Sequence, residues 1–108
     1  RVGYFVNRVA GANTGRPVLC ITLYPFFLDF GVVPPGLQCQ ATPEEYRQAL
    51  RDIVAACPCP NVHLVEGPEI LREMTNLTCD LIHPGDYGMM EMARHLTEKW
   101  QSLASRKH

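Results

Sequence analysis

Residues 17–24 read PVLCITLY, a nearly unbroken apolar run that indicates the fold class. The run is partly β-branched and lies between Pro17 and Pro25. A short apolar run bounded in this way is typical of a strand that is buried on both faces. Such strands belong to parallel sheets with helices on both sides. Residues 17–24 therefore predict a strand of an α/β protein.

A well-marked helix follows further along the chain. Thr42, Pro43 and Glu45 form a capping box with proline in the first helical turn, and the prolines after Cys57 end the helix. Apolar side chains at helical spacing predict its buried stripe: Tyr46, Leu50, Ile53 and Val54. Polar side chains are expected to face the solvent: Arg47, Gln48, Arg51 and Asp52.

Residues 61–67, NVHLVEG, predict a second short strand. A strand, a helix and a strand in this order form a βαβ unit, whose two strands are parallel. Before this unit, residues 4–10 predict the tail of a helix that the glycines after it stop. At 108 residues the chain is one domain at most, with a modest core.

Residues 25–41 form a long irregular segment that carries several aromatic side chains. Loops of this length are often functional. This segment leaves the C-terminal end of a predicted parallel strand, which is where open α/β sheets bind ligands. We therefore expect Tyr24, Phe26 and Phe27 to contact a substrate. The alternative is that these aromatic side chains pack over the core.

An acid and an imidazole stand three residues apart in residues 80–88, DLIHPGDYG. A short loop can fold the Asp80 carboxylate onto one ring nitrogen of His83. This contact fixes the tautomer and leaves the other nitrogen free to act as a base. Gly85 and Gly88 are expected to keep bulk away from the ring. The alternative is a helix-capping loop, because the D-x-x-H pattern is weak by itself.

The last helix is expected to begin at about Pro84 or Asp86 and to end at about Ala104. Its predicted buried stripe is apolar throughout: Met89, Met92, Ala93, Leu96, Trp100 and Leu103. Charged side chains are expected on the outside: Glu91, Arg94, Glu98 and Lys99. His95 flanks the stripe and is expected at the surface.

The composition limits the partners and the compartment. The formal charge is −1 and 46% of the residues are hydrophobic. Lysine and arginine are scattered among acids, which argues against nucleic-acid binding, and no apolar run approaches the ~20 residues that span a bilayer. Five cysteines without a paired pattern predict reduced thiols in a cytosol-like, cytoplasmic compartment. No pattern requires a metal or a cofactor.

These segments together resemble a known family. The chain has a strand ending in Thr-x-Tyr-Pro, a capped helix, an Asn-Val-x-Leu-Val-Glu-Gly strand and then DLIHPGDYGM from residue 80. It is similar to the C-terminal half of an SGNH (GDSL-type) hydrolase, of the GDSL-like lipase/acylhydrolase group that ends in D-x-L-H-P-S-D-Y-G-M. The resemblance covers nearly all 108 residues and is most specific over residues 80–92. Ile82 and Gly85 replace the Leu and Ser common in that group.

The resemblance implies a partial flavodoxin-like three-layer α/β/α fold, the SGNH hydrolase fold, with parallel strands and a C-terminal helix. It also implies hydrolysis of small-molecule or carbohydrate esters through a Ser–His–Asp triad. His83 matches the general base of the family and Asp80 the acid that orients it. His83 would take the serine proton and later deliver it to the leaving alcohol, while Asp80 holds the ring.

The sequence departs from the family at the nucleophile. The family has a Gly-Asp-Ser-type block near its N-terminus and takes oxyanion donors from this block, a glycine and a Gly-x-Asn block. None of these is present, and the serines are Ser102 and Ser105. We therefore expect residues 1–108 to be the C-terminal portion of a single SGNH domain without its nucleophile-bearing part. Such a chain would be inactive alone and, with open sheet edges, prone to self-association.

Two other classes of function remain open. One is a non-catalytic α/β interaction or carbohydrate-binding module that has kept the scaffold. The other is an unrelated α/β domain of the nucleotide-binding or response-regulator type. A serine in a strand–turn–helix context upstream would favour the hydrolase, whereas a phosphate loop or an acidic pocket there would favour the last alternative.

Overall fold

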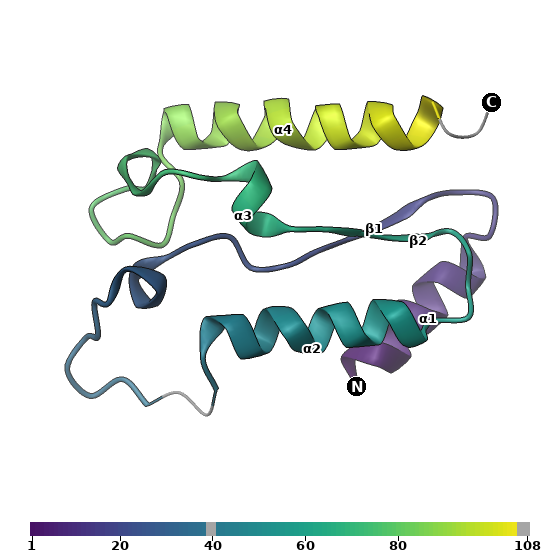
Figure 1. Ribbon diagram of the computed structural model, residues 1–108, viewed down its shortest axis with the longest axis horizontal. Helices are drawn as coiled ribbons and strands as arrows, with labels where there is room; N and C mark the ends of the chain where they lie inside the picture. The colour runs from purple at the N-terminus through teal and green to yellow at the C-terminus, as the bar shows by residue number, and fades with distance from the viewer. Residues whose placement is uncertain (39–40, 106–108) are drawn as a thin grey trace. The chain divides into compact units, whose positions relative to one another are not determined.

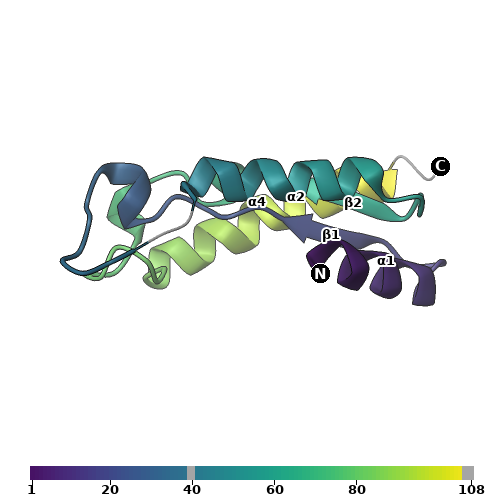
Figure 2. The same cartoon turned by 90° about the horizontal axis from the view of Figure 1, so that it is seen from below.

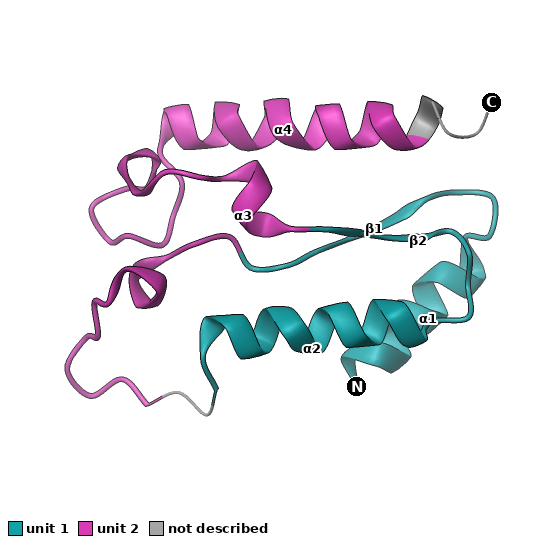
Figure 3. Ribbon diagram, in the orientation of Figure 1, with its two compact units in different colours: residues 1–23, 41–65 teal, residues 24–40, 66–108 magenta. Residues whose placement is uncertain are grey.

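The computed structural model describes residues 1–38 and 41–105 (Figure 1). Within these residues the chain is a mixed α/β protein with four α-helices and one two-stranded parallel sheet. It forms two compact units (Figure 3). The first comprises residues 1–23 and 41–65, and the second residues 24–40 and 66–108. The assignment of residues 1–108 to one portion of a single domain stays a prediction.

The first unit is a strand–helix–strand motif preceded by a helix. Its elements are α1 (Val2–Ala12), β1 (Val18–Ile21), α2 (Pro43–Ala56) and β2 (Val62–Val65). β1 and β2 run side by side in both views (Figures 1 and 2) and pair in parallel, with Val18 opposite Val62 and Ile21 opposite Val65. The predicted parallel pair is confirmed, although both strands are shorter than expected.

The start of α2 follows the predicted capping box. The Thr42 hydroxyl accepts a hydrogen bond from the Glu45 amide over 3.1 Å, and the Glu45 carboxylate accepts one from the Thr42 amide over 3.0 Å. The reciprocal bonds satisfy two amides that have no partner within the helix. Hydrogen bonding by Thr42, first through its backbone amide and then through its side chain, lowers the pKa of the Glu45 carboxyl group.

The buried face of α2 differs from the predicted one. Tyr46 is 52% exposed, whereas only 4% of Arg47 is exposed. The expectation that Tyr46 faces the core and Arg47 the solvent is therefore wrong. The Nε–H of Arg47 donates to the Leu23 carbonyl oxygen over 2.7 Å. Arg47 is buried because it supplies a hydrogen-bond donor to a backbone carbonyl just beyond β1. The spacing of apolar residues does not predict such a hydrogen bond.

The strand β1 is not buried on both faces, which corrects the prediction from residues 17–24. Cys20 and Thr22 are buried, but Ile21 and Leu23 between and after them are exposed. Successive side chains of a strand point to opposite faces, so one face lies in the core and the other is open. The self-association that such an open face suggests stays a prediction.

Asn61 ties the end of α1 to the start of β2. Its Nδ2 lies 3.1 Å from the Ala10 carbonyl oxygen, 2.9 Å from that of Asn13 and 3.0 Å from that of Arg16. The carbonyl groups at a helix C-terminus have no partner within the helix. One carboxamide therefore serves the helix end and the following turn together.

The second unit holds two 3₁₀ helices, Phe27–Phe30 and Met74–Asn76, and the helices α3 (Gly67–Ile70) and α4 (Asp86–Ser105). The long final helix is confirmed. Residues 25–38 are irregular apart from the first 3₁₀ helix, as predicted, and residues 39–40 lie outside the described part.

The buried face of α4 is turned relative to the predicted stripe. Met89, Ala93 and Trp100 are exposed, whereas His95 is only 6% exposed and the Glu91 side chain is nearly buried. The expectations for these five residues are wrong. α3 packs on α4, and the imidazole Nδ1 of His95 lies 3.1 Å from the carbonyl oxygen of the buried Ile70. The end of α3 needs a polar partner, and this requirement sets which side of α4 turns inward.

Gly88 allows the first turns of α4 to pass close to the 3₁₀ helix Met74–Asn76. A Cβ atom at Gly88 would lie 2.2 Å from the Asn76 carbonyl oxygen, whereas one at Gly85 would lie 3.7 Å from it, an ordinary contact. Gly88 thus makes room for a backbone carbonyl. The expectation that Gly85 and Gly88 keep bulk away from the His83 ring stays a prediction.

Candidate active site

The loop that precedes α4 brings Asp80 and His83 together. The Oδ2 atom of Asp80 lies 2.5 Å from the Nδ1 atom of His83. An ionised carboxylate only accepts hydrogen bonds, so the proton belongs on Nδ1 and Nε2 is the basic nitrogen. The His83 side chain is 75% exposed and that of Asp80 46%, so the pair is open to solvent. The contact expected from the spacing is present, and the catalytic role of the pair stays a prediction.

The loop backbone is wrapped around the second carboxylate oxygen of Asp80. Oδ1 accepts three hydrogen bonds: 2.7 Å from the Thr78 hydroxyl and 3.0 Å from each of the Ile82 and His83 amides. Leu81 has a positive φ of 57°, a left-handed conformation that costs energy for a leucine. This turn directs both following amides at the carboxylate.

These contacts hold the pKa of the Asp80 carboxyl group well below its ordinary value. The His83 side chain is the largest cause, followed by the His83 and Ile82 amides and the Thr78 hydroxyl. Hydrogen bonds to the charged form favour that form. Asp80 therefore stays ionised at neutral pH and can balance a positive charge on His83.

Two backbone hydrogen bonds close the base of this loop. The Thr78 amide donates to the His83 carbonyl over 2.7 Å, and the Gly85 amide donates to the Asn76 carbonyl over 2.8 Å. The segments on either side of Asp80 are thereby joined as a short antiparallel bridge. The Asp80–His83 pair (the dyad) lies in this closed loop of residues 76–85 (the dyad loop).

The aromatic residues predicted to contact a substrate divide into two groups. The Tyr24 hydroxyl donates to the Ile82 carbonyl oxygen over 2.6 Å, which brings this side chain to the dyad loop. Phe26 and Phe27 pack edge to face against each other, with ring centroids 5.2 Å apart. Contact of these three residues with a substrate stays a prediction. The sequence patterns did not predict the Thr78 and Ile82 contacts, although an Asp side chain that accepts from the amide two residues further on is a known turn-forming arrangement.

The serine Ser102 cannot serve this dyad within the same chain. It lies 16 residues beyond Asp86, the first residue of α4. At 1.5 Å per residue this is ~24 Å along the helix axis. Ser105 lies further along the same helix. Neither serine of α4 is therefore placed to act with His83 in the same chain.

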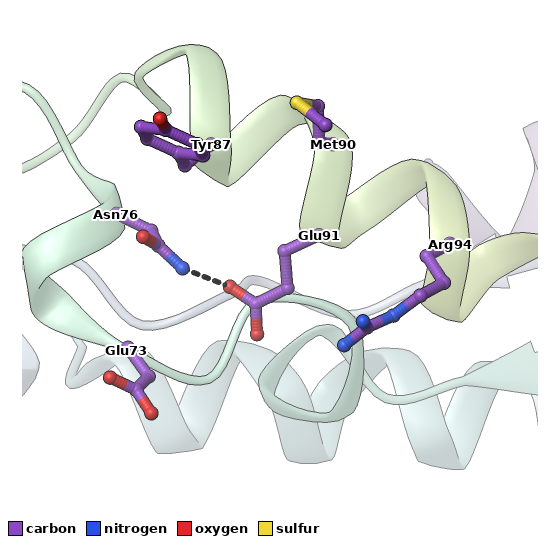
Figure 4. Close-up of a pocket in the computed structure, with 6 residues that line it drawn as sticks. All are labelled: Glu73, Asn76, Tyr87, Met90, Glu91 and Arg94. Atoms are coloured by element: carbon purple, nitrogen blue, oxygen red, sulfur yellow. Dashed lines mark hydrogen bonds between the residues drawn. The ribbon is translucent and has the colours of Figure 1, made fainter.

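A separate hollow of about 530 Å³ lies in the second unit (Figure 4). It is lined by six residues that include neither Asp80 nor His83: Glu73, Asn76, Tyr87, Met90, Glu91 and Arg94. The side-chain Nδ2 of Asn76 donates to Glu91 Oε1 over 2.7 Å, and the backbone amide of Arg72 donates to Glu91 Oε2 over 3.0 Å (Figure 4 shows the first bond). The sequence does not predict this hollow, because the helical spacing puts Glu91 on the outside of α4.

Four cysteines are free thiols in the structure: Cys20, Cys57, Cys59 and Cys79. Cys39 lies outside the described residues. Burial, and next the neighbouring Cys57, raises the pKa of the Cys20 thiol. Among the described residues no group of three or more His, Cys, Asp or Glu side chains is placed to hold a metal ion. The expectations of no metal and no cofactor stay predictions.

The comparisons with known proteins add nothing to this geometry. The chain has no match among protein-family models, curated proteins or solved structures. The helices of residues 1–38 and 41–105 include none with the length and apolar character needed to cross a membrane.

Proposed function

We propose that the chain supplies the acid–base half of a serine ester hydrolase of the SGNH type. His83 is the general base and Asp80 is the residue that orients it. The 2.5 Å contact between Asp80 Oδ2 and His83 Nδ1, which leaves Nε2 open to solvent, is the observation that carries the proposal. The parallel β1–α2–β2 unit also suits one part of a flavodoxin-like α/β/α domain.

The proton follows a simple path in this reaction. His83 Nε2 takes the proton from a serine hydroxyl while the serine oxygen attacks the acyl carbon of the ester. The ionised Asp80 stabilises the imidazolium that forms. His83 then gives the proton to the alcohol oxygen as the ester bond breaks, and a water repeats the sequence to release the acid and free the serine. The serine and the oxyanion donors come from protein outside residues 1–108.

The experiment uses the complete protein that contains this chain, as its native host makes it (the complete product). A fluorophosphonate probe tests for an activated serine, and a short-chain aryl ester tests for turnover. His83→Gln should lower kcat by roughly 10³-fold or more, and Asp80→Asn by roughly 10²- to 10⁴-fold. His63→Gln, a change in β2, is the matched histidine control and should leave kcat unchanged. A His83→Gln protein with the wild-type kcat/KM would contradict the proposal.

A non-catalytic binding module is the second candidate. The separation of the 530 Å³ hollow from the dyad residues favours it, since a ligand in the hollow would not need His83. In that case the complete product would bind carbohydrate or a protein partner equally well with His83→Gln and would hydrolyse no ester.

A further inference from the structure

We propose that Tyr24 is a positioning residue of the Asp80–His83 dyad and acts through the peptide group that joins Ile82 to His83. The catalytic consequence of this inference rests on the proposed function, whereas its geometric basis does not.

One peptide group links the tyrosine to the aspartate. The Tyr24 hydroxyl donates to the carbonyl oxygen of Ile82 over 2.6 Å. The amide of the same peptide group, that of His83, donates to Asp80 Oδ1 over 3.0 Å. Hydrogen bonds in such a chain polarise one another. The phenol therefore strengthens the bond by which the backbone holds the carboxylate, and the carboxylate in turn holds the imidazole.

The dyad loop needs an anchor of this kind. Its other hydrogen bonds are local, within residues 76–85, and both side chains of the Asp80–His83 pair are exposed. Leu81 holds a left-handed conformation that a free chain would rarely adopt. Tyr24 stands 58 residues away from Ile82 in sequence, so its bond is a tertiary restraint on the loop.

The phenol is suited to act as a donor. Burial, and next the negative charge of Asp80, raises the pKa of the Tyr24 hydroxyl. The group therefore stays protonated over the neutral range in which an ordinary histidine works as a base. A phenylalanine at this position would keep the ring and remove only the donor.

The test compares wild type with Tyr24→Phe by NMR on the 108-residue chain. The amide proton of His83 should move upfield and exchange with solvent about two- to tenfold faster, the range for one neutral hydrogen bond. The ¹⁵N shifts of the His83 ring should move away from the pure Nδ1–H tautomer. Tyr4→Phe, which alters an exposed tyrosine of α1, is the control and should change none of these signals.

A graded substitution covers the case in which Tyr24→Phe does not fold. A 3-fluorotyrosine at position 24 keeps the bond and makes the hydroxyl a stronger donor, so the His83 amide proton should move downfield. A purely structural role for the ring predicts no such opposite shift. Unchanged His83 signals in the folded Tyr24→Phe or 3-fluorotyrosine protein overturn the inference.

Activity of the complete product separates this inference from the proposed function. Tyr24→Phe should lower kcat about two- to tenfold with KM unchanged. If the His83 signals shift but His83→Gln keeps full activity, the positioning role stands and the esterase proposal fails. If His83→Gln abolishes activity and Tyr24→Phe changes neither kcat nor the His83 signals, only the positioning role fails.

Discussion

The Nε–H of Arg47 donates a hydrogen bond to the carbonyl oxygen of Leu23 over 2.7 Å. Arg47 belongs to α2, and Leu23 lies just beyond the end of β1, so a buried guanidinium joins a helix to the strand that precedes it. The exposed Glu44 carboxylate, 3.5 Å from Arg47 Nη1, supplies the opposite charge. Buried charges are tolerated only with partners of this kind.

Arg47→Met should lower the free energy of unfolding by roughly 1–3 kcal/mol, because it leaves the Leu23 carbonyl without this donor. Urea unfolding followed by circular dichroism measures the change. Arg51→Met is the matched control: Arg51 pairs with the same Glu44 at 2.6 Å near the surface and should cost less than about 1 kcal/mol. Equal losses in the two variants would refute a special role for Arg47.

Gly88→Ala should destabilise the chain by at least about 2 kcal/mol, because the new Cβ would meet the Asn76 carbonyl oxygen at 2.2 Å. Gly11→Ala is the matched control. Gly11 lies inside α1 with nothing within 4 Å of a new Cβ, so this change should stabilise the chain by about 0.5–1 kcal/mol. Urea midpoints of the two variants should therefore move in opposite directions.

Asn61→Ala should lower the unfolding free energy by roughly 1–3 kcal/mol, because three carbonyl oxygens lose their common donor. Asn61→Asp should cost more, since it places a carboxylate against the negative end of the α1 dipole. Thermal unfolding of both variants at neutral pH measures the order. The idea is wrong if Asn61→Asp is as stable as the wild type.

The stability of the chain should fall as the pH drops below about 4. The pKa of Asp80 is lower in the folded chain than in the unfolded chain, so its stabilising effect is present above the unfolded pKa and is lost as pH falls toward the folded value. The pKa values of Glu44 and Glu45 are lowered too, chiefly by Arg51 and by the Thr42 amide, and act in the same direction.

Urea unfolding at several pH values tests this for wild type and Asp80→Asn. The variant should be less stable near neutral pH, and the difference should shrink in acid, while Glu44 and Glu45 keep part of the pH dependence in both proteins. A difference that stays constant from about pH 7 to about pH 3 would show that ionisation of Asp80 does not stabilise the fold.

Local chemistry explains why several features could be predicted from the sequence. The capping box of Thr42 and Glu45 satisfies amides within one helical turn, and the Asp80–His83 contact spans three residues. The parallel pairing of β1 and β2 follows from the connection between them. Each depends on residues close in sequence or on a general rule of chain connection.

Residue patterns were therefore enough to predict the α/β character, the helix start at Pro43 and the Asp80–His83 contact. The tertiary structure alone sets which side of each helix is buried. Arg47 and His95 turn inward because distant backbone carbonyls, those of Leu23 and Ile70, need polar partners. It also decided that Tyr24 meets the dyad loop. The periodicity of apolar residues predicts only which apolar surface is buried. A buried carbonyl also requires a hydrogen-bond partner, wherever the fold places it.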